Sequence, residues 1–441
     1  MRTHVKHVDF TCHPSDTARR LRAAGERPCG RCKSSVHAIG TGYYTCGGWR
    51  CPRAITQRSR DQQPLHLPND ESKDKFVFKL TLFSMRAVLV KNDAGPADSL
   101  YIGQVETPVA NANEVLVKVK AFGLNRMDIH QREGHYPPPP GSSTVLGVEF
   151  SGQITSVGTQ VTRWNVGDEV LGLAGGGAYA EYIVVPQTHI VTKPAHLTWA
   201  EAAAIPENFL TGSQGSFLPE IVVDLLPAFQ AIVLCGEIKA EDNVLVHAGA
   251  SGVGIAAIQL ARFYQAKTVT ATASTSVKLD FLRSISNGAT HTANYKTQDF
   301  SQVVLEETTG GKGVDVLVDF VGQSHFEKNL NSLAMDGRMT LLAFLSGPVV
   351  PSVNLATILR KRLRIQGSTL RSRTPTYQSE LIARFEREIL EHITGQDGPG
   401  EIKTYIHKAS ASVIFPWSEI QAAHREMEAD ANIGKIIAEI D

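Results

Sequence analysis

A short apolar strand that runs directly into a glycine-rich turn is the feature that most constrains this chain. Residues 242–247 read Asp-Asn-Val-Leu-Val-His, and residues 248–254 read Ala-Gly-Ala-Ser-Gly-Val-Gly. The helical pattern that follows places apolar residues on one face, namely Val253, Ala257, Leu260 and Ala261. Small residues in such a turn let the backbone approach a diphosphate, and the helix N-terminus presents N–H groups to that anion. The segment predicts the first unit of a doubly wound nucleotide-binding fold.

Further strand-like runs alternate with helical segments after this turn. They lie at 267–272, 314–320, 338–343 and 363–366. Such alternation predicts a parallel sheet with helices on both faces. The glycine spacing departs from G-x-G-x-x-G, so an α/β domain that binds nothing at this turn is the alternative. The residues that we expect to bind the cofactor here are Gly249, Ala250, Ser251, Gly252, Val253 and Gly254.

The segment after the second strand of this fold indicates which nicotinamide cofactor is used. Residues 272–278 read Thr-Ala-Ser-Thr-Ser-Val-Lys and contain no acid. Enzymes that use NAD usually place Asp or Glu there, to accept hydrogen bonds from the ribose hydroxyls. Ser274 and Lys278 would instead bind a 2′-phosphate through charge-assisted hydrogen bonds. The sequence therefore predicts NADPH, and an ordinary solvated lysine is the alternative for Lys278.

A formal net charge of zero hides an uneven distribution of charge along the chain. Residues 1–84 hold 15 Lys and Arg against 7 Asp and Glu, which leaves 29 against 37 in the remainder. The acidic remainder gives no electrostatic reason to expect nucleic acid as a partner. No run of about 18 apolar residues is present, so the sequence predicts no membrane span.

The first 84 residues differ from the rest in composition. They contain five of the six cysteines, and Cys29, Cys32, Cys46 and Cys51 could imitate a four-thiolate zinc site. We favour a disordered extension, or translated sequence upstream of the true start, because the stretch has little apolar periodicity. Only Cys235 lies beyond it, which fits a reducing compartment. We expect a cytoplasmic protein, or a mitochondrial one if the basic extension is genuine.

Several motifs in the first half of the remaining chain resemble one family. They are Ala121-Phe-Gly-Leu-Asn-Arg-Met-Asp128, Gln131-Arg-x-Gly-x-Tyr-Pro137, Gly147-Val-Glu-Phe-Ser-Gly152, Val166-Gly-Asp-Glu-Val170 and Ala203-Ala-Ile-Pro206. Together they resemble the medium-chain dehydrogenase/reductase superfamily, and most of all its zeta-crystallin-like quinone oxidoreductase branch. The resemblance covers residues 85–441 almost continuously.

This resemblance implies a fold and a division into domains. It implies a GroES-like, partly open β-barrel catalytic domain at 85–205 and 371–441. It also implies a Rossmann domain with a doubly wound parallel sheet, which binds NADPH, at 206–370. The active site would lie in the cleft between them, and homodimers are usual in such proteins.

The resemblance also bears on catalysis without a metal. The zinc branch needs a cysteine where Asn125 stands and a histidine where Val148 stands, and neither residue can supply those ligands. Hydrogen-bond donors can instead stabilise the oxygen on which charge develops. Asn125 and Tyr136 match positions that line the site in similar enzymes, so we predict that both are catalytic. The alternatives are a turn-stabilising asparagine and a structural tyrosine, and Asp128 and Arg132 are expected to form an ion pair or a cap.

Other segments resemble those that contact the cofactor elsewhere in the family. The expected contacts are Thr211, Tyr295, Leu370, Arg371, Asn432 and Lys435, with Lys435 near a phosphate. The family pattern is interrupted after Thr211 by sixteen residues, 212–227. This insert is either a genuine loop over the cleft or a retained intron in the gene model, and we favour the second interpretation.

The resemblance and the cofactor motif together predict a function. We expect hydride transfer from NADPH to a quinone or another α,β-unsaturated carbonyl compound, without a metal. An enoyl reductase acting on acyl or polyketide chains is one alternative. A cofactor-binding protein with little or no catalysis is the other.

Overall fold

The computed structural model describes residues 84–209, 228–368, 374–407 and 414–441. Every described residue belongs to one compact unit, Phe78–Asp441. The predictions for the basic extension and for the insert at 212–227 therefore lie outside the described residues.

The first part of this unit is built on a sheet that forms a partly open barrel, and all of its strand pairs are antiparallel except β16 with β17. The sheet has the order β16-β17-β3-β4-β5-β7, and β6 also pairs with β3. A separate hairpin of β1 and β2 is joined to it by a bridge between Ala87 and Ala180. The strands are β1 (Ser84–Val90), β2 (Leu100–Glu106), β3 (Glu114–Gly123), β4 (Glu149–Val157), β5 (Glu169–Leu173), β6 (Tyr182–Pro186), β7 (Ile190–Thr192), β16 (Phe415–Pro416) and β17 (Ile437–Glu439).

Alternation along β3 shows why these residues form a barrel wall. Val115, Val117 and Val119 are at most 1% exposed, whereas Leu116 and Lys118 between them are more accessible. Successive side chains of a strand point to opposite faces, so the valines face the barrel interior. β17 pairs antiparallel with the end of β3, and this pairing brings the end of the chain into the barrel wall.

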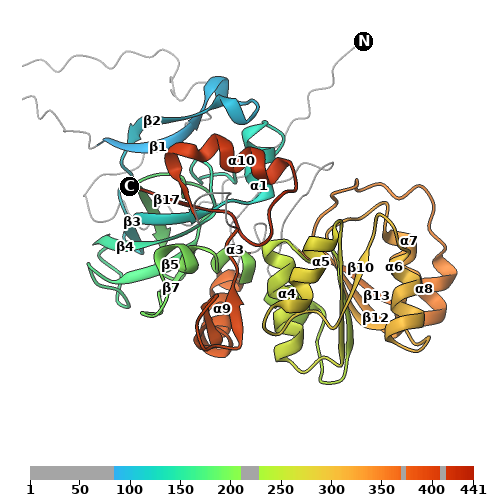
Figure 1. The fold of residues 1–441 in the computed structure, drawn as a ribbon. Coiled ribbons are helices and arrows are strands. Elements are labelled where there is room, and N and C mark those ends of the chain that lie inside the picture. Colours follow the sequence, from blue (N-terminus) through green and yellow to red (C-terminus); the bar gives the residue numbers. More distant parts are fainter. Residues whose placement is uncertain (1–83, 210–227, 369–373, 408–413) are drawn as a thin grey trace, which may run out of the picture. The chain divides into compact units, whose positions relative to one another are not determined.

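The second part is a six-stranded sheet in which every neighbouring pair is parallel. Its order is β10-β9-β8-β11-β12-β13, the arrangement of two mononucleotide-binding halves. The strands are β8 (Asn243–Val246), β9 (Thr268–Ala273), β10 (His291–Asn294), β11 (Val314–Asp319), β12 (Leu333–Leu341) and β13 (Arg364–Gly367). Figure 1 shows α4 and α5 on one side of this sheet and α6, α7 and α8 on the other. The predicted fold class, a GroES-like barrel with a Rossmann domain, is confirmed.

Helices cover the sheets and connect the two parts. The α-helices are α1 (Arg126–Arg132), α2 (Trp199–Ala203), α3 (Pro206–Phe209), α4 (Gly252–Phe263), α5 (Ser276–Ser284), α6 (Phe300–Gln302), α7 (Phe326–Ser332), α8 (Leu355–Lys361), α9 (Pro375–Glu388) and α10 (Ile420–Glu428). π-Helical segments are η4 (Gln230–Cys235) and η5 (Val303–Thr308). Short 3₁₀ turns are η2 (Lys91–Asp93), η3 (Ala97–Ser99), η6 (Leu390–His392) and η7 (Trp417–Glu419), and a small parallel pair joins β14 (Ile393–Gly395) to β15 (Ile402–Thr404). No helix in the described part of the chain has both the length and the apolar character that crossing a membrane requires.

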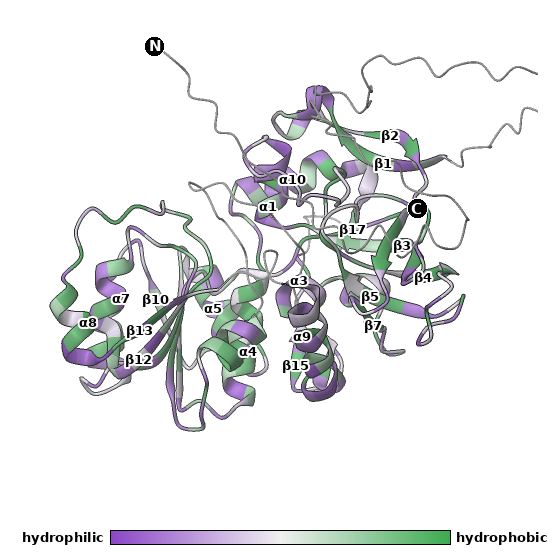
Figure 2. Cartoon of the chain, turned by 180° about the vertical axis from the view of Figure 1, so that it is seen from behind, coloured by the Kyte–Doolittle hydropathy of each residue, from purple (hydrophilic) through white to green (hydrophobic). Residues whose placement is uncertain are grey.

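One hydrophobic core joins the parallel sheet to the barrel. It includes α4, nine of whose residues are buried, the apolar face of α9, and Leu171, Leu173 and Val191 from β5 and β7. Figure 2 shows the difference between these helices, because α4 is largely hydrophobic whereas α9 is largely hydrophilic. A second core fills the barrel and contains Phe122, Phe150 and Trp417, all completely buried.

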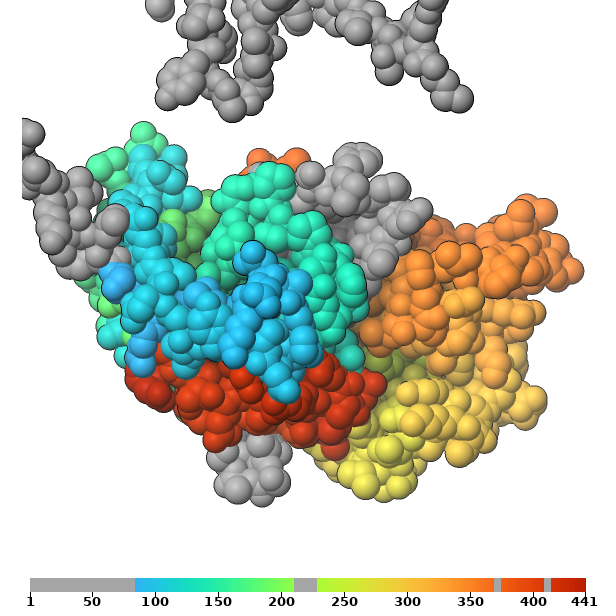
Figure 3. All heavy atoms as spheres, turned by 90° about the horizontal axis from the view of Figure 1, so that it is seen from above, coloured from blue at the N-terminus to red at the C-terminus, as the bar shows by residue number. Residues whose placement is uncertain are grey.

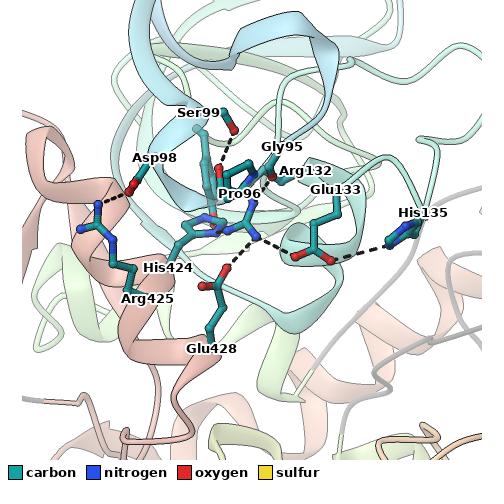
Figure 4. A network of polar contacts seen from close by, with 11 residues as sticks. Gly95, Pro96, Asp98, Ser99, Arg132, Glu133, His135, His424, Arg425 and Glu428 are labelled. Carbon is teal, nitrogen blue, oxygen red and sulfur yellow. Dashed lines mark hydrogen bonds and ion pairs between the residues drawn. The ribbon is translucent and has the colours of Figure 1, made fainter.

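The C-terminal segment packs against the beginning of the barrel. α10 contacts β2 and η3, and Figure 3 shows the red C-terminal residues alongside the blue first strands. The Arg132 side chain at the end of α1 is 1% exposed and is held by α10. One of its nitrogens lies 3.2 Å from His424 Nδ1, and another lies 2.6 Å from the carboxylate of Glu428 (Figure 4). These contacts fix α1, which begins immediately after Asn125.

A completely buried histidine anchors the first strand of the parallel sheet. His247 directly follows β8; its Nδ1 lies 3.0 Å from Thr272 Oγ1 and its Nε2 lies 2.7 Å from Asn329 Oδ1. These contacts link β8 to β9 and to α7 at the base of the glycine turn. Burial, together with the nearby His325, lowers the pKa of His247 from 6.5 to about 3. The folded chain therefore keeps this imidazole neutral.

We predict that His247 makes the fold sensitive to acid. Below the ordinary pKa of about 6.5 the unfolded chain binds a proton at this residue, whereas the folded chain does so only near pH 3. Its stabilising contribution is therefore complete above pH 6.5 and is lost as the pH falls, by up to about 1.4 kcal/mol per pH unit. Urea unfolding at several values between about pH 7.5 and pH 5 should give a shallower pH slope for His247→Gln than for the parent protein. Equal slopes would contradict this assignment.

Candidate active site

A cleft of about 380 Å³ lies between the barrel and the parallel sheet. The barrel contributes Leu124, Asn125 and Arg126 at the start of α1. The sheet side contributes the glycine turn and the residues that follow β9 and β11. A C-terminal stretch from Asp430 to Ile436 forms the remaining wall. A nucleotide fold is expected to bind its ligand at the carboxyl ends of the strands, where the strand order reverses, and the cleft lies at that place.

The glycine turn is shaped for close approach to its neighbours. A Cβ atom on Gly254 would lie 2.4 Å from the carbonyl oxygen of Ala248, and one on Gly252 would lie 2.5 Å from Asn208 Oδ1. Ser251 departs from the family pattern, and it acts as the N-cap of α4, because its Oγ accepts a hydrogen bond of 3.0 Å from Gly254 N–H. The turn thus places the N-terminus of α4 at the wall of the cleft.

The C-terminal segment lies directly against this turn. Gly434 N–H donates to the carbonyl oxygen of Ala250 over 2.9 Å, and Gly434 also forms a parallel bridge with Ser251. Asn432 Nδ2 donates to the carbonyl oxygen of Gly434 over 2.8 Å, which stiffens the segment. Residues that are about 180 positions apart in the sequence therefore share one wall of the cleft.

Positive charge gathers at the end of β9. Lys278 Nζ donates to the backbone oxygen of Asp430 over 2.6 Å, and the Asp430 carboxylate pairs with Arg126. Burial lowers the pKa of Lys278, and the charges of Arg126 and Lys296 lower it further. Lys278 and Arg126 therefore share this end of the cleft with one acid, Asp430, and a bound anion would relieve the repulsion between the cations.

The opposite side of the cleft contains a buried triad of polar side chains. Asn125 Nδ2 donates to Glu149 Oε1 over 2.8 Å, and Lys435 Nζ donates to Asn125 Oδ1 over 2.5 Å. Lys435 also pairs with Glu149, whose second oxygen accepts from Glu207 N–H over 2.7 Å. All three side chains of the triad are at most 5% exposed. The Asn125 amide is consequently held in one orientation from both ends.

A zinc ion does not fit this group of residues. Val148 offers no donor atom, and Asn125 supplies neither a thiolate nor an imidazole. Glu149 is a carboxylate, but the ammonium of Lys435 already neutralises it. A divalent cation at this position would lie against that ammonium and would be repelled by it.

The structure brings most of the predicted site residues to the cleft. Those that line it are Asn125, Ala250, Ser251, Gly252, Val253, Ser274, Lys278, Tyr295, Asn432 and Lys435. Gly249 and Gly254 shape the turn from behind. Tyr136 is half-buried and is not among the lining residues, so its catalytic role stays a prediction. Thr211, Leu370 and Arg371 lie outside the described residues.

The structure shows the contacts of two charged residues that the sequence singles out. The ammonium of Lys435 contacts Asn125 and Glu149, and its expected place near a phosphate stays a prediction. Asp128 caps α1 by accepting a 2.8 Å hydrogen bond from Asn125 N–H, so it is a cap and does not pair with Arg132. Complete burial raises the pKa of Asp128 to about 6, although its hydrogen bonds oppose this rise.

Sequence reasoning missed several residues of the cleft. Asn208 in α3 lines it, and the buried Oδ1 of this residue has no hydrogen-bond partner among the described residues. An unpaired buried acceptor of this kind fits a ligand that supplies an N–H donor. Arg126 and His325 also line the cleft. Asn208 lies between Pro206, which ends a family motif, and Thr211, an expected cofactor contact, so its position was an available signal, whereas His325 had none.

Removing the positive member of the triad should destabilise the fold. In Lys435→Met the buried carboxylate of Glu149 loses its charged partner, which typically costs about 3–5 kcal/mol. We expect the free energy of unfolding, measured in urea, to fall by about that amount. The double variant Lys435→Met/Glu149→Gln removes the uncompensated charge and should recover part of the loss. A double variant less stable than the single one would contradict this account of the triad.

Comparisons with known proteins agree with this architecture. Residues 111–195 match the family described as Alcohol dehydrogenase GroES-like domain, and residues 252–387 match that described as Zinc-binding dehydrogenase. The quinone oxidoreductase of Lama guanicoe is 29% identical over 329 residues, which cover 74% of this chain and 93% of that protein. The synaptic vesicle membrane protein VAT-1 homolog of Danio rerio is 35% identical over 232 residues, which cover 53% of this chain and 44% of that protein.

A solved structure shares the whole arrangement. The crystal structure of CurK enoyl reductase superposes with a TM-score of 0.65 at 26% sequence identity, over 81% of this chain and 99% of that one. The GroES-like family model falls on the barrel, and the dehydrogenase model falls mainly on the parallel sheet and its helices. The chain is therefore an oxidoreductase of the medium-chain dehydrogenase/reductase superfamily and belongs to its quinone oxidoreductase branch.

Proposed function

We propose that this protein transfers hydride from NADPH to a quinone or another α,β-unsaturated carbonyl compound, without a metal. The observation that carries the proposal is that one cleft contains three features. They are the glycine turn, a cationic end formed by Lys278 and Arg126, and the Asn125 amide, which two hydrogen bonds hold in one orientation. Members of this superfamily bind nicotinamide cofactors. The similarity to a quinone oxidoreductase supports the substrate class.

The cationic end supports the choice of NADPH over NADH. Ser274 and Lys278 line the cleft where the adenosine ribose of a bound dinucleotide is expected, after the second strand of the fold. Arg126 lies within reach of the same place, since it pairs with Asp430 beside Lys278. The Asp430 carboxylate at this end is already paired with Arg126, so the cations can bind an additional phosphate.

The triad supplies what a carbonyl substrate needs during reduction. NADPH, when bound, provides the hydride, which adds to a carbon of the substrate and leaves negative charge on its oxygen. The Asn125 amide has two N–H donors, and Glu149 takes one of them. The second donor and the adjacent ammonium of Lys435 can stabilise an oxyanion in the cleft. Solvent water supplies the proton that completes the two-electron reduction.

Cofactor selectivity tests the phosphate-binding role of Lys278. Lys278→Ala removes one charge-assisted hydrogen bond, so we expect NADPH binding to weaken about ten-fold or more and NADH binding to change little. Fluorescence titration with each cofactor measures both affinities. Lys312→Ala, an exposed lysine outside the cleft, is the matched control and should leave both affinities unchanged.

An unchanged NADPH-to-NADH ratio in Lys278→Ala would remove the basis for NADPH. The same titration on a variant without residues 212–227 distinguishes the two interpretations of the insert. Tight NADPH binding only in that variant favours the retained intron.

Turnover tests the role assigned to the Asn125 amide. Asn125→Ser keeps a small polar residue before α1 but removes the amide, so we expect kcat for a model quinone to fall about 100-fold. The dissociation constant for NADPH should stay within about two-fold of the parent value, because the cationic end is intact. A kcat close to the parent value would show that the amide does not stabilise the transition state.

The resemblance to CurK enoyl reductase favours a second candidate, reduction of the double bond of an acyl thioester. The two candidates use the same cofactor and the same oxyanion chemistry, and they differ in the substrate. A comparison of kcat/KM for a model quinone and for an α,β-unsaturated acyl thioester separates them. Turnover of the thioester alone would replace our first candidate with the second.

A further inference from the structure

Three potential metal ligands lie together at the end of α1, outside the cleft. They are His130, Glu133 and His135, and their ligating atoms all lie within 4.8 Å of one another. In the described ranges this is the one group of three or more His, Cys, Asp or Glu side chains with that spacing. None of the three lines the cleft, so the proposed reductase function makes no use of them.

The helix terminus itself brings the two histidines together. Gly134 has a φ of +78°, and its N–H donates to the carbonyl oxygen of Gln131 over 3.0 Å. The N–H of His135 reaches back to the carbonyl oxygen of His130 over 2.9 Å. These two bonds define a Schellman motif, in which the residues joined by the longer-range bond commonly make an apolar contact. Here both of those residues carry an imidazole, and the backbone turn holds the pair.

The carboxylate of Glu133 is already oriented for a shared ligand. Its Oε1 accepts a 2.9 Å hydrogen bond from Arg132, and its Oε2 lies 3.7 Å from Nδ1 of His135 (Figure 4). Tetrahedral zinc with bonds of about 2.0–2.2 Å requires ligand atoms roughly 3.3–3.6 Å apart. The Glu133–His135 distance is therefore close to the required value before any metal binds.

The surroundings allow a cation despite the adjacent guanidinium. Arg132 also pairs with Glu428, so its charge is compensated, and its bond to Glu133 is of the kind that orients ligands from the outer shell. Glu133 and His135 are 35% and 63% exposed, so their side chains can close the remaining gap.

We propose that His130, Glu133 and His135 form a binding site for a divalent transition metal, with Zn²⁺ as the expected ion. Two imidazoles and a carboxylate suit zinc, and three protein ligands leave the fourth position open to water or an exogenous ligand. This site is distinct from the Asn125 position, where a zinc ion does not fit. It lies next to Tyr136, and a bound ion ties the segment leading to Tyr136 to the end of α1.

Zinc binding to the full chain tests the proposal. The protein is stripped of metal with a chelator and titrated calorimetrically with ZnCl₂ at about pH 7.5. Compared with the parent, His130→Ala/His135→Ala should lose one equivalent of bound zinc. The thiols in residues 1–84 do not confuse this result, because both proteins contain them and only the difference is used. Glu133→Gln should weaken the same binding event at least about ten-fold.

Controls make either outcome informative. His196→Ala/His392→Ala removes two surface imidazoles outside the group and should bind as much zinc as the parent. The single variant His135→Ala changes a side chain that is 63% exposed, so it tests the site without disturbing the core. Equal zinc uptake and affinity in the parent, the double variant and His135→Ala would overturn the proposal. NADPH binding is measured in parallel, so failure of this site is distinguishable from failure of the proposed reductase.

Discussion

The buried ion pair between Lys435 and Glu149 is the interaction on which the site depends. Two charges removed from water need each other and further hydrogen bonds, and here Asn125 and the backbone of Glu207 supply them. Glu149 begins β4, Asn125 precedes α1, and Lys435 precedes β17. A single electrostatic centre therefore positions barrel, helix and C-terminal segment together, and that segment reaches the glycine turn through Gly434.

The ammonium of Lys435 lies beside Glu149 and Asn125, and Asn125 stands where the zinc branch needs a cysteine. In the function that we propose, this ammonium helps to polarise the carbonyl oxygen of the substrate. An ammonium needs no cysteine and no metal supply, and its protons can be donated. In the proposed function Lys435 supplies the positive charge that a zinc ion would supply if positions 125 and 148 carried its ligands. The sequence alone did not indicate this role of Lys435.

Much of the fold was predictable from the sequence because its signals are local. The run 242–254 encodes strand, turn and helix in consecutive residues, and the structure has β8, the turn and α4 at those positions. Four residues that line the cleft, 250–253, followed from the same segment. The role of Lys435 was not predictable, because its partners are about 290 to 310 residues away and no local pattern records them. His325 was missed for a similar reason, since only the folded chain brings it to the cleft, whereas Asn208 lay beside a motif that could have indicated it. The domain boundaries, homodimer formation and absence of nucleic-acid partners stay predictions.

The pairing of β17 with β3 has a consequence for the synthesis of the protein. Ile437, Ala438 and Glu439 complete a wall whose other strands, apart from β16, are made near the beginning of the described chain. The parallel sheet uses only residues between Asn243 and Gly367, so all of its strands emerge from the ribosome before the barrel can close. The barrel must wait for the final residues, and during that interval its unpaired β3 edge is open to chaperones or to neighbouring nascent chains.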